Sequence, residues 1–410
     1  MGIGKNEGGI AAVRFFADLG WNVIATDIQT AEQLNLDLAE YSHYSNITWK
    51  LGAHDENDFI TVDLIVKNPA VPVTNALIAL AENHGETVTN DAEIFLRVVP
   101  KKKIIGITGT KGKTTTCLLL GHLLRKKFTV EVLGIPGKSV LEIFYTPMPD
   151  YVIAEFSSFD CELISTSPHI TILTSFFPDH INRHKTLNEY RRAKFNLFEY
   201  QDGGDIAFLP KSSAQEFMND AAQIYFDIEK NTKANMPWHI HENSITAAVC
   251  GAQHLGITSA EITAQLQTFI PPTGRRQIIE LGKGISIIND TTSTTPRAAA
   301  DTITKILEQN FSRNIHIIVG GEDKAFPESE VELLRNVLHK IRHQVLLLPG
   351  SLSDRILIGT RVNSFKEAAQ YTKERQVKMV ALVPGAASFN MFVNEFDRGE
   401  KFISNMINYL

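Results

Sequence analysis

The chain has 410 residues, too many for one ordinary hydrophobic core, so we expect two or three domains. Apolar residues make up 43% and charged residues 21%, a balance typical of globular proteins, and the net charge of −6 argues against nucleic acid as the main partner. The three cysteines lie far apart with no Cys/His spacing, which suggests neither disulfides nor a zinc site. No signal peptide and no apolar run of about 20 residues is visible, which predicts a cytoplasmic protein without membrane insertion.

The first segment has the pattern of a dinucleotide-binding βαβ unit without its first strand. Glycines at the start are followed by a helix-like segment over 10–19 and by a strand-like segment over 21–27 that ends in Asp27. The strand that normally precedes such glycines is absent. Either the sequence starts after that strand, or something else fills its position in the sheet.

Strand and helix signals alternate along the rest of the chain, which predicts an α/β fold with mainly parallel sheets. Pro100 with the basic run after it, and the Pro/Gly-rich stretch 269–277, mark boundaries. We therefore expect three domains, over 1–92, 93–268 and 269–410. The expected strands lie within 62–70, 151–158, 169–177, 284–292, 314–324, 344–351 and 377–386, and the expected helices within 74–85, 114–127, 188–200, 241–256 and 296–309, with one more at the end of the chain.

The stretch "GITGTKGKTTT", residues 106–116, resembles a phosphate-binding loop, although five residues rather than four separate Gly106 from Gly112. A strand that leads through a Gly-rich turn into a helix points backbone N–H groups at an anion. Lys113 can then reach the outer phosphates, and the Thr114 hydroxyl can bind Mg²⁺. The alternative is a flexible Gly/Lys loop. The order of strand, turn, Lys-Thr and helix favours a nucleotide site.

A Mg²⁺-dependent reaction needs further oxygen ligands, and two of the predicted strands end in suitable residues. Glu155 ends the strand "YVIA", and Asp179 and His180 follow the next one, at the sheet edge where α/β proteins bind ligands. A surface Glu and a polar loop are the alternatives. Lys194, on an amphipathic helix, would by itself be interpreted as a solvated lysine.

Seven stretches together resemble the Mur ligases. In order they are "GITGTKGKTTT", "EFSSFDCE", "FFPDHINRH", "EYRRAKFNLF", "NDTTSTTP", "VGGEDK" and "PGAASFNMF" with "FDRG", and the resemblance runs over essentially the whole chain. The family form of the phosphate loop, T-G-T-[NK]-G-K-[ST], accommodates the extra residue. The resemblance implies an N-terminal Rossmann-like domain that binds a UDP-substrate, a central P-loop-type ATPase domain and a C-terminal Rossmann-like domain that binds an amino acid.

The resemblance also implies a reaction. ATP would phosphorylate the carboxylate of UDP-N-acetylmuramoyl-L-alanine, and the amine of D-glutamate would attack the acyl phosphate to form an amide. This places the chain in peptidoglycan precursor synthesis, and so in cell-wall biogenesis, cell shape and cell division. The enzyme is expected to act as a monomer.

The resemblance assigns a role to each matching residue. Lys113, Glu155, His180 and Lys194 would be catalytic, and two Mg²⁺ ions would be held by Thr114, Glu155, His180 and a carbamylated Lys194. The implied ATP-binding set is Gly109, Thr110, Lys111, Gly112, Lys113, Thr114, Thr115, Asn243, Arg275 and Asp290. The implied substrate set is Asp27 and Asn68 at the uridine end, Ser157 and Ser158, and Thr294, Lys324, Ser388 and Phe389 at the amino acid.

Two positions depart from the family pattern. Thr292 stands where a lysine near the carboxylate of the amino acid is expected, and Ile135 stands where an asparagine is expected to contact the muramoyl group. Two alternatives to the D-glutamate ligase therefore stay open. One is a related ligase that adds a different amino acid, or a folylpolyglutamate-type ligase, although the latter lacks an N-terminal UDP domain. The other is an N-terminally truncated, nucleotide-binding relative with impaired activity.

Overall fold

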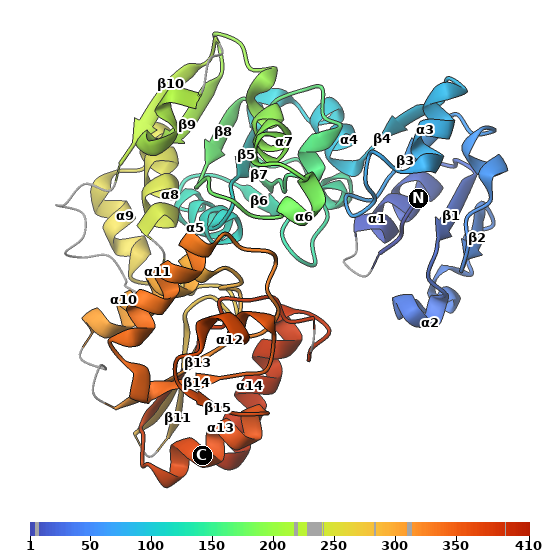
Figure 1. Cartoon of the computed structure of the whole chain (residues 1–410). Coiled ribbons are helices and arrows are strands. Elements are labelled where there is room, and N and C mark those ends of the chain that lie inside the picture. Colours follow the sequence, from blue (N-terminus) through green and yellow to red (C-terminus); the bar gives the residue numbers. More distant parts are fainter. Residues whose placement is uncertain are drawn as a thin grey trace. The chain divides into compact units, whose positions relative to one another are not determined.

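The computed structural model describes residues 1–4, 8–216, 220–227, 240, 242–282, 284–309, 314–389 and 391–410. The chain divides into two compact units, which are described separately (Figure 1). The first unit comprises Met1–Pro178, Lys185–Ala234 and Glu242–Phe269, and the second comprises Asp179–His184, Asn235–His241 and Ile270–Leu410. Over the described ranges, no helix combines the length and the apolar character needed to cross a bilayer.

The N-terminal part of the first unit contains two separate parallel strand pairs, β1 with β2 and β3 with β4. Helix α1 begins at Gly8, two residues before the predicted start. Asn75 caps α3, and Gly85, with φ of 86°, lets the chain turn after it as predicted. The elements are α1 (Gly8–Asp18), β1 (Val23–Asp27), α2 (Ala31–Leu34), β2 (Ile47–Leu51), β3 (Leu64–Val66), α3 (Ala76–Asn83), β4 (Thr87–Thr89) and α4 (Asp91–Val98).

The rest of the first unit is built on a six-stranded sheet in the order β10-β9-β8-β5-β7-β6, with every pair parallel. Residues of α4 and α7 pack on one face, and Gly121 of α5 packs on the other face against Val132 and Ile153. The elements are β5 (Ile104–Thr108), α5 (Lys113–Leu124), β6 (Val130–Leu133), β7 (Tyr151–Glu155), β8 (Ile170–Leu173), α7 (Leu187–Glu199), β9 (Ile206–Pro210), β10 (Ala222–Phe226), α8 (Glu242–His254) and α9 (Ser259–Leu266).

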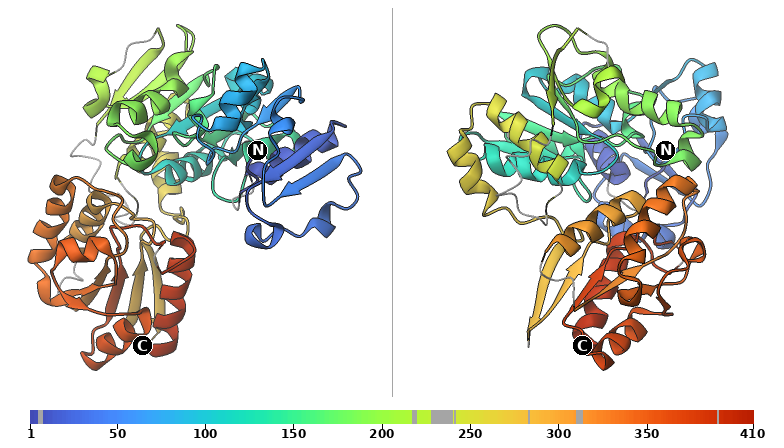
Figure 2. Two further views of the ribbon diagram at one scale, coloured as in Figure 1. Left: turned by 45° about the vertical axis from the view of Figure 1, so that its right-hand side comes forward. Right: turned by 60° about the vertical axis from the view of Figure 1, so that its left-hand side comes forward.

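The second unit is a three-layer structure around a sheet in the order β11-β12-β16-β13-β14-β15. Helices α10, α11 and α12 pack on one face and α13 and α14 on the other (Figure 2). The elements are α6 (Ile181–His184), β11 (Gln277–Gly282), β12 (Ile285–Asn289), α10 (Pro296–Glu308), β13 (Ile315–Val319), α11 (Glu328–His339), β14 (Val345–Leu347), α12 (Ser351–Ile356), β15 (Thr360–Arg361), α13 (Phe365–Glu374), β16 (Met379–Leu382) and α14 (Glu395–Tyr409).

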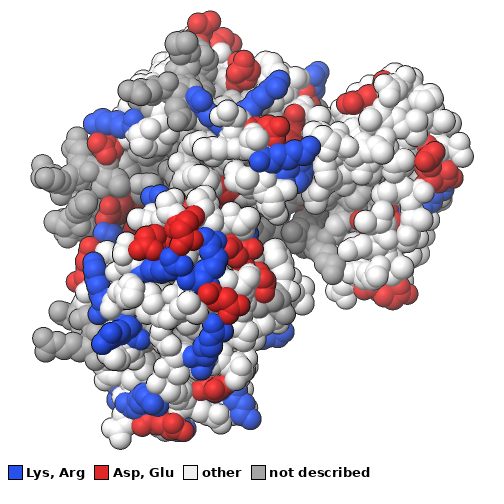
Figure 3. All heavy atoms as spheres, in the orientation of Figure 1, with Lys and Arg blue, Asp and Glu red and all other residues white. Residues whose placement is uncertain are grey.

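The prediction of an α/β chain with mainly parallel sheets is confirmed, but strands β2, β4, β6, β9, β10, β11 and β15 were not predicted. The predicted linker over 269–277 leads directly into β11, which pairs with β12 in the antiparallel sense. The three-domain boundaries at 92/93 and 268/269 stay a prediction. On the face drawn in Figure 3, acidic and basic side chains are interspersed over the second unit, where Glu328 of α11 forms ion pairs with Arg335 and Arg355.

Candidate active site

The phosphate loop connects the end of β5 to the start of α5, as the sequence predicts. Gly112 occupies the N-cap position of α5 with φ of 90°, and Lys113 is the first residue of the helix. Gly109 has φ of 150°, and a Cβ at this position would lie 2.0 Å from Oγ1 of Thr174. Only glycine fits there. The loop therefore presents the N-terminus of a twelve-residue helix to an anion, which favours phosphate.

The loop is held in place by residues that follow β8, the neighbouring strand. The backbone N–H of Thr110 donates to the Ser175 carbonyl (2.9 Å), and the N–H of Lys111 donates to the Ser175 hydroxyl (3.0 Å). Thr174 in turn donates its hydroxyl to the Lys111 carbonyl (2.6 Å). The sequence analysis missed both residues. Hydrogen bonds on both sides of the loop fix its shape before any nucleotide binds.

Lys113 and Glu155 lie together at the carboxyl edge of the central sheet. Glu155 is the last residue of β7 and pairs with Ile107 of β5, which brings its carboxylate to 3.9 Å from Nζ of Lys113. In the described part of the chain, Oε2 of Glu155 is buried and has no hydrogen-bond partner. A buried carboxylate oxygen without a partner is costly unless a cation binds it. The Glu155 carboxylate and the hydroxyl of Thr114 in α5 provide oxygen ligands of the kind that Mg²⁺ prefers, so these two residues fit the ion.

If Glu155 and Thr114 hold Mg²⁺, the ion should raise the thermal stability of the folded chain. For the unmodified chain, adding Mg²⁺ to saturating ATP is expected to raise the unfolding midpoint by about 3 °C or more, because a ligand that binds only the folded state stabilises it. Glu155→Gln should lose most of this Mg²⁺-dependent increment. The exposed Glu199→Gln at the end of α7 should keep it. A full Mg²⁺ increment in Glu155→Gln, measured by calorimetry, would show that Glu155 does not hold the ion.

Lys194 is not the solvated lysine that its helix position alone suggests. Only 2% of it is exposed, and its Nζ donates to the Gly109 carbonyl at 2.8 Å. Nζ also lies 4.9 Å from the ring centre of Tyr190, whose hydroxyl donates to Oγ1 of Thr110 at 3.0 Å. One face of α7 therefore packs directly on the phosphate loop. The sequence analysis also missed Tyr190.

Asp179 and His180 belong to the second unit. Asp179 is buried, whereas 41% of the His180 side chain is exposed, and Nε2 of His180 lies 3.6 Å from Oδ2 of Asp179. His180 has φ of 53°, an unusual backbone conformation for a residue other than glycine. Its role as a ligand of the second Mg²⁺ stays a prediction. Across the described ranges, no three His, Cys, Asp or Glu side chains form a group that could hold a metal by themselves.

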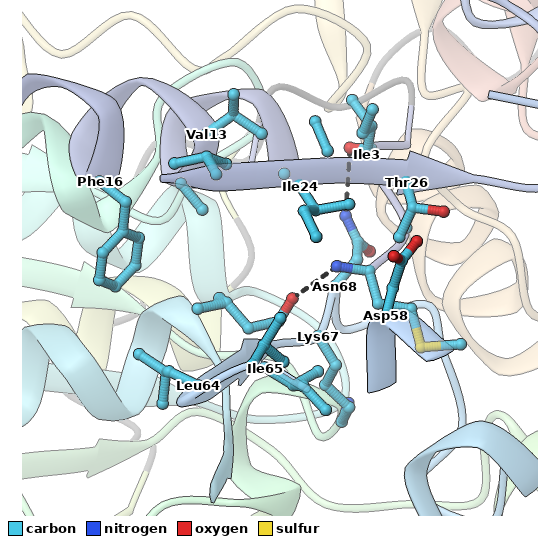
Figure 4. Close-up of a pocket in the computed structure, with 18 of the residues that line it drawn as sticks. Ile3, Val13, Phe16, Ile24, Thr26, Asp58, Leu64, Ile65, Lys67 and Asn68 are labelled. Atoms are coloured by element: carbon cyan, nitrogen blue, oxygen red, sulfur yellow. Dashed lines mark hydrogen bonds between the residues drawn. The ribbon is translucent and has the colours of Figure 1, made fainter. Parts of the chain in front are cut away.

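Asp27 and Asn68 shape the glycine-rich N-terminal segment, and the Asn68 side chain lies beside Ile3 in a pocket between β1 and β3 (Figure 4). Oδ2 of Asp27 accepts hydrogen bonds from the N–H groups of Ile3 (2.7 Å) and Gly4 (3.1 Å). The Asn68 backbone N–H donates to the Met1 carbonyl (2.9 Å), and its side-chain oxygen accepts from the Ala70 N–H (2.9 Å). Both side chains therefore have structural roles at the edge where a uridine would bind. Their contact with the UDP-substrate stays a prediction.

Ser157 and Ser158 follow Glu155 on the loop after β7. The Ser157 hydroxyl accepts from the N–H groups of Phe159 (3.1 Å) and Asp160 (3.2 Å), and Ser158 is buried. These hydrogen bonds fix the chain direction immediately after Glu155. Substrate contacts of the two serines stay predictions.

In the second unit, Asp290 is 1% exposed and its carboxylate is fully engaged inside the unit. Oδ1 accepts from the Arg276 N–H (3.0 Å), and Oδ2 accepts from the hydroxyls of Ser293 and Thr302. Asp290 therefore shapes the loop that contains Thr292 and Thr294. Its predicted ribose contact, and the contacts predicted for the half-buried Arg275 and the exposed Asn243, stay predictions.

Two of the four residues predicted for the amino acid lie side by side. Nζ of Lys324 donates to Oγ1 of Thr294 at 3.3 Å, and it lies 3.8 Å from Oδ1 of Asp179. Ser388 is buried and Phe389 is 72% exposed. The structure thus brings Lys324 and Thr294 together, and the roles of all four residues stay predictions.

Arg398 is another residue whose importance the sequence analysis missed, although it lies in the quoted "FDRG". Its guanidinium donates to the carbonyls of Thr291 (2.8 Å), Ala386 (3.0 Å) and Ala387 (3.2 Å). Loss of hydration lowers the pKa of Arg398 to about 10. This buried side chain joins the loop that contains Thr294 to the loop that contains Ser388.

Comparison with known proteins agrees with this geometry. Residues 107–275 match the model of the Mur ligase middle domain, which begins within β5. UDP-N-acetylmuramoylalanine--D-glutamate ligase of Roseiflexus sp. strain RS-1 is 30% identical, over 98% of this chain and 96% of that protein. The enzyme of the same name from Borreliella afzelii strain PKo is 29% identical, over 98% of this chain and 95% of its own.

Solved structures show the same fold. MurF ligase from Thermotoga maritima in complex with ADP gives a TM-score of 0.60 at 17% identity, covering 86% of this chain and 98% of that one. UDP-N-acetylmuramate-alanine ligase MurC from the same organism gives 0.59 at 19% identity, covering 98% and 97%. The resemblance seen in the sequence is therefore confirmed: the chain belongs to the Mur ligase family and has its three-domain α/β fold.

Proposed function

We propose that this chain is an ATP-dependent ligase that adds D-glutamate to UDP-N-acetylmuramoyl-L-alanine during peptidoglycan precursor synthesis. The supporting observation is that Lys113 and Glu155, with the buried Lys194, surround the phosphate loop of a chain that resembles such ligases over 98% of its length. We further propose that it works as a monomer in the cytoplasm, where ATP is available.

A carboxylate lacks a good leaving group and must be activated before an amine can form an amide with it. An amine does not displace oxide from a carboxylate, so one carboxylate oxygen first attacks the γ-phosphorus of ATP, and ADP leaves. The amine nitrogen then attacks the acyl carbon, and the tetrahedral intermediate expels phosphate and loses a proton to give the amide. Every species on this path is anionic. The Lys113 ammonium and the amide N–H groups at the start of α5 stabilise that charge where it develops.

Mg²⁺ would supply further positive charge at the transferred phosphate when it is bound. Thr114 and Glu155 are proposed to hold the first ion. Lys194 is proposed to hold the second as a carbamate, together with His180. The support for the carbamate is that Lys194 is buried against Gly109 of the phosphate loop, where an ammonium loses its hydration.

Lys324 is proposed to bind a carboxylate of D-glutamate. Lys324→Ala is expected to raise the KM for D-glutamate about 10- to 100-fold, the loss typical of one charge-assisted hydrogen bond, with a smaller change in kcat. Lys340→Ala, an exposed lysine at the end of α11, serves as the matched control and should leave both constants unchanged. An unchanged KM for D-glutamate in Lys324→Ala would remove Lys324 from the amino-acid site.

The second candidate is a related ligase that adds a different amino acid. One residue favours it. Thr292 replaces the lysine expected near the amino acid, and its hydroxyl donates to the Gly274 carbonyl (3.0 Å). Lys324 would then be the cation left to pair with the carboxylates of the amino acid.

The test is ATP-dependent phosphate release with UDP-N-acetylmuramoyl-L-alanine, measured in parallel with D-Glu, L-Glu, L-Ala and meso-diaminopimelate. Release with D-Glu alone is the expected result. Release with another amino acid would select the second candidate. ATP binding without turnover on any amino acid would identify a nucleotide-binding relative with impaired activity.

A further inference from the structure

Lys324 lies in a short loop between β13 and α11 whose backbone is strained. We call residues 323–326 the Lys324 loop. The carboxylate of Asp323, its first residue, accepts the N–H of Phe326, its last residue (2.9 Å). Between them, Ala325 has φ of 60°, a left-handed conformation that costs free energy for a residue other than glycine. Contacts from outside the loop are therefore needed to hold it in this shape.

Arg355 of α12 makes such contacts with both ends of the Lys324 loop. Its Nη1 donates to Oδ2 of Asp323 and to the Phe326 carbonyl (3.0 Å). Its Nη2 donates to Oε2 of Glu328, the first residue of α11 (2.6 Å). One planar guanidinium thus joins the first and last residues of the loop and the helix that follows. A lysine ammonium, which lacks the rigid fork of donors, would reproduce this only in part.

A second set of hydrogen bonds fixes the chain just before the Lys324 loop. The N–H of Asp323 donates to the Ser351 hydroxyl (2.9 Å), and this hydroxyl donates to the Glu322 carboxylate (2.6 Å). Glu322 and Ala387 exchange both of their backbone hydrogen bonds (3.1 and 2.9 Å). Because Ala387 directly precedes Ser388, the Lys324 loop is joined here to another segment of the predicted amino-acid site.

The ammonium of Lys324 depends on this loop for its position. Its Nζ lies 3.3 Å from Oγ1 of Thr294 and 3.8 Å from Oδ1 of Asp179, both long distances for a charged pair. A lysine head group sits on a flexible four-carbon stem, so where the ammonium lies is decided largely by where the backbone is held. Arg355 bonds to the two ends of the loop, and so it acts on Lys324 through the backbone.

We propose that Arg355 is a positioning residue of the amino-acid site, which holds the Lys324 loop in the shape that presents the Lys324 ammonium to a carboxylate of the amino acid. The proposal rests on the proposed function of Lys324. Without the guanidinium, the loop would relax from the left-handed conformation at Ala325, and Lys324 would sample more positions. Binding the amino acid would then require more ordering, which lowers affinity, whereas the reaction of an amino acid already bound would change less.

The test is steady-state phosphate release by Arg355→Met, with the amino acid varied at saturating ATP and UDP-substrate. Methionine keeps an apolar stem but lacks the guanidinium. The KM for D-glutamate is expected to rise about 5- to 10-fold, with less than about a twofold change in kcat. Arg361→Met is the matched control and should keep both constants, because Arg361 forms an exposed ion pair with Asp354, the neighbour of Arg355 in α12 (2.8 Å).

A combination with Lys324→Ala tests whether Arg355 acts through Lys324. If it does, Arg355→Met should change the KM for D-glutamate by less than about twofold once Lys324 is already alanine, because residues that act as one unit are not additive. A further rise of about 5- to 10-fold in the double variant would overturn the proposal, since Arg355 would then affect the amino acid by a route that does not include Lys324.

Amide hydrogen exchange examines the loop without any turnover. The Phe326 N–H is expected to exchange about fivefold faster or more in Arg355→Met, whereas the Leu348 N–H, which donates to Val319 in the sheet (2.8 Å), should keep its rate. Arg355→Lys keeps the charge and should give intermediate values of both the KM and the exchange rate. This variant decides the question if Arg355→Met does not fold.

A KM for D-glutamate equal to that of the original chain in the folded Arg355 variants overturns the proposal, even if exchange at Phe326 is faster. A failure of the proposed function is distinguishable from this result, because the original chain itself would then release no phosphate with D-glutamate. Release with another amino acid would move the same KM measurements to that amino acid.

Discussion

Lys113→Ala is expected to lower kcat by at least about 10³-fold, to the background of the assay. Removal of one preorganised charge at a developing anion typically costs about 3–4 kcal/mol of transition-state stabilisation, and Lys113 is placed to contact the transferred phosphate throughout the reaction. Its Nζ lies 3.9 Å from Glu155, so the substitution also leaves that carboxylate without its nearby cation. The measurement is steady-state phosphate release at saturating ATP and acceptor.

Folding must be separated from catalysis in this experiment. Lys126→Ala, an exposed lysine just after α5, is the matched control and should keep full activity. Far-ultraviolet circular dichroism and the unfolding midpoint of Lys113→Ala should match those of the original chain. Turnover within tenfold of the original chain would show that Lys113 does not stabilise the transferred phosphate.

Lys194→Ala is expected to lower kcat by at least about 10²-fold. The side chain is buried, and its hydrogen bond to Gly109 joins α7 to the phosphate loop. A purely structural lysine and a carbamylated lysine both predict a loss of activity. The turnover of the variant alone therefore does not distinguish these two roles. The dependence of activity on carbon dioxide does distinguish them.

The carbamate forms from the neutral amine and CO₂, so depletion of CO₂ and bicarbonate should lower the activity of the original chain several-fold. Added bicarbonate should restore it. Lys194→Ala should respond to neither treatment, and Tyr190→Phe, which keeps the ring beside Lys194, should still respond. Activity of the original chain that is independent of bicarbonate would leave Lys194 with the structural role only.

The sequence predicted the centre of the site well because local rules determine it. The strand–glycine–helix order of residues 106–116 places Lys113 at a helix N-terminus whatever the rest of the chain does. Glu155 could be placed because strands of a parallel sheet end at the same edge, and β5 and β7 are neighbours. In both cases the chemistry lies within a few residues of a recognisable element.

What the sequence did not reveal depends on contacts between distant segments. Lys194 looks like a surface lysine until α7 is seen to pack on Gly109, a residue 85 positions away. The support from Thr174 and Ser175 is invisible because neither residue type is diagnostic in a loop. Strand β11 was hidden because it begins directly after Pro/Gly-rich residues that are typical of a linker. Arg398 was passed over because its three carbonyl partners lie on two separate loops.

The central claim is that this site transfers a phosphate onto a carboxylate, and oxygen transfer tests it most directly. UDP-N-acetylmuramoyl-L-alanine labelled with ¹⁸O at both oxygens of the alanine carboxylate is converted with ATP and D-glutamate, and the released phosphate is analysed by mass spectrometry. The account predicts one ¹⁸O atom in each phosphate, because the carboxylate oxygen leaves with the phosphorus. Phosphate without the label during amide formation would contradict it.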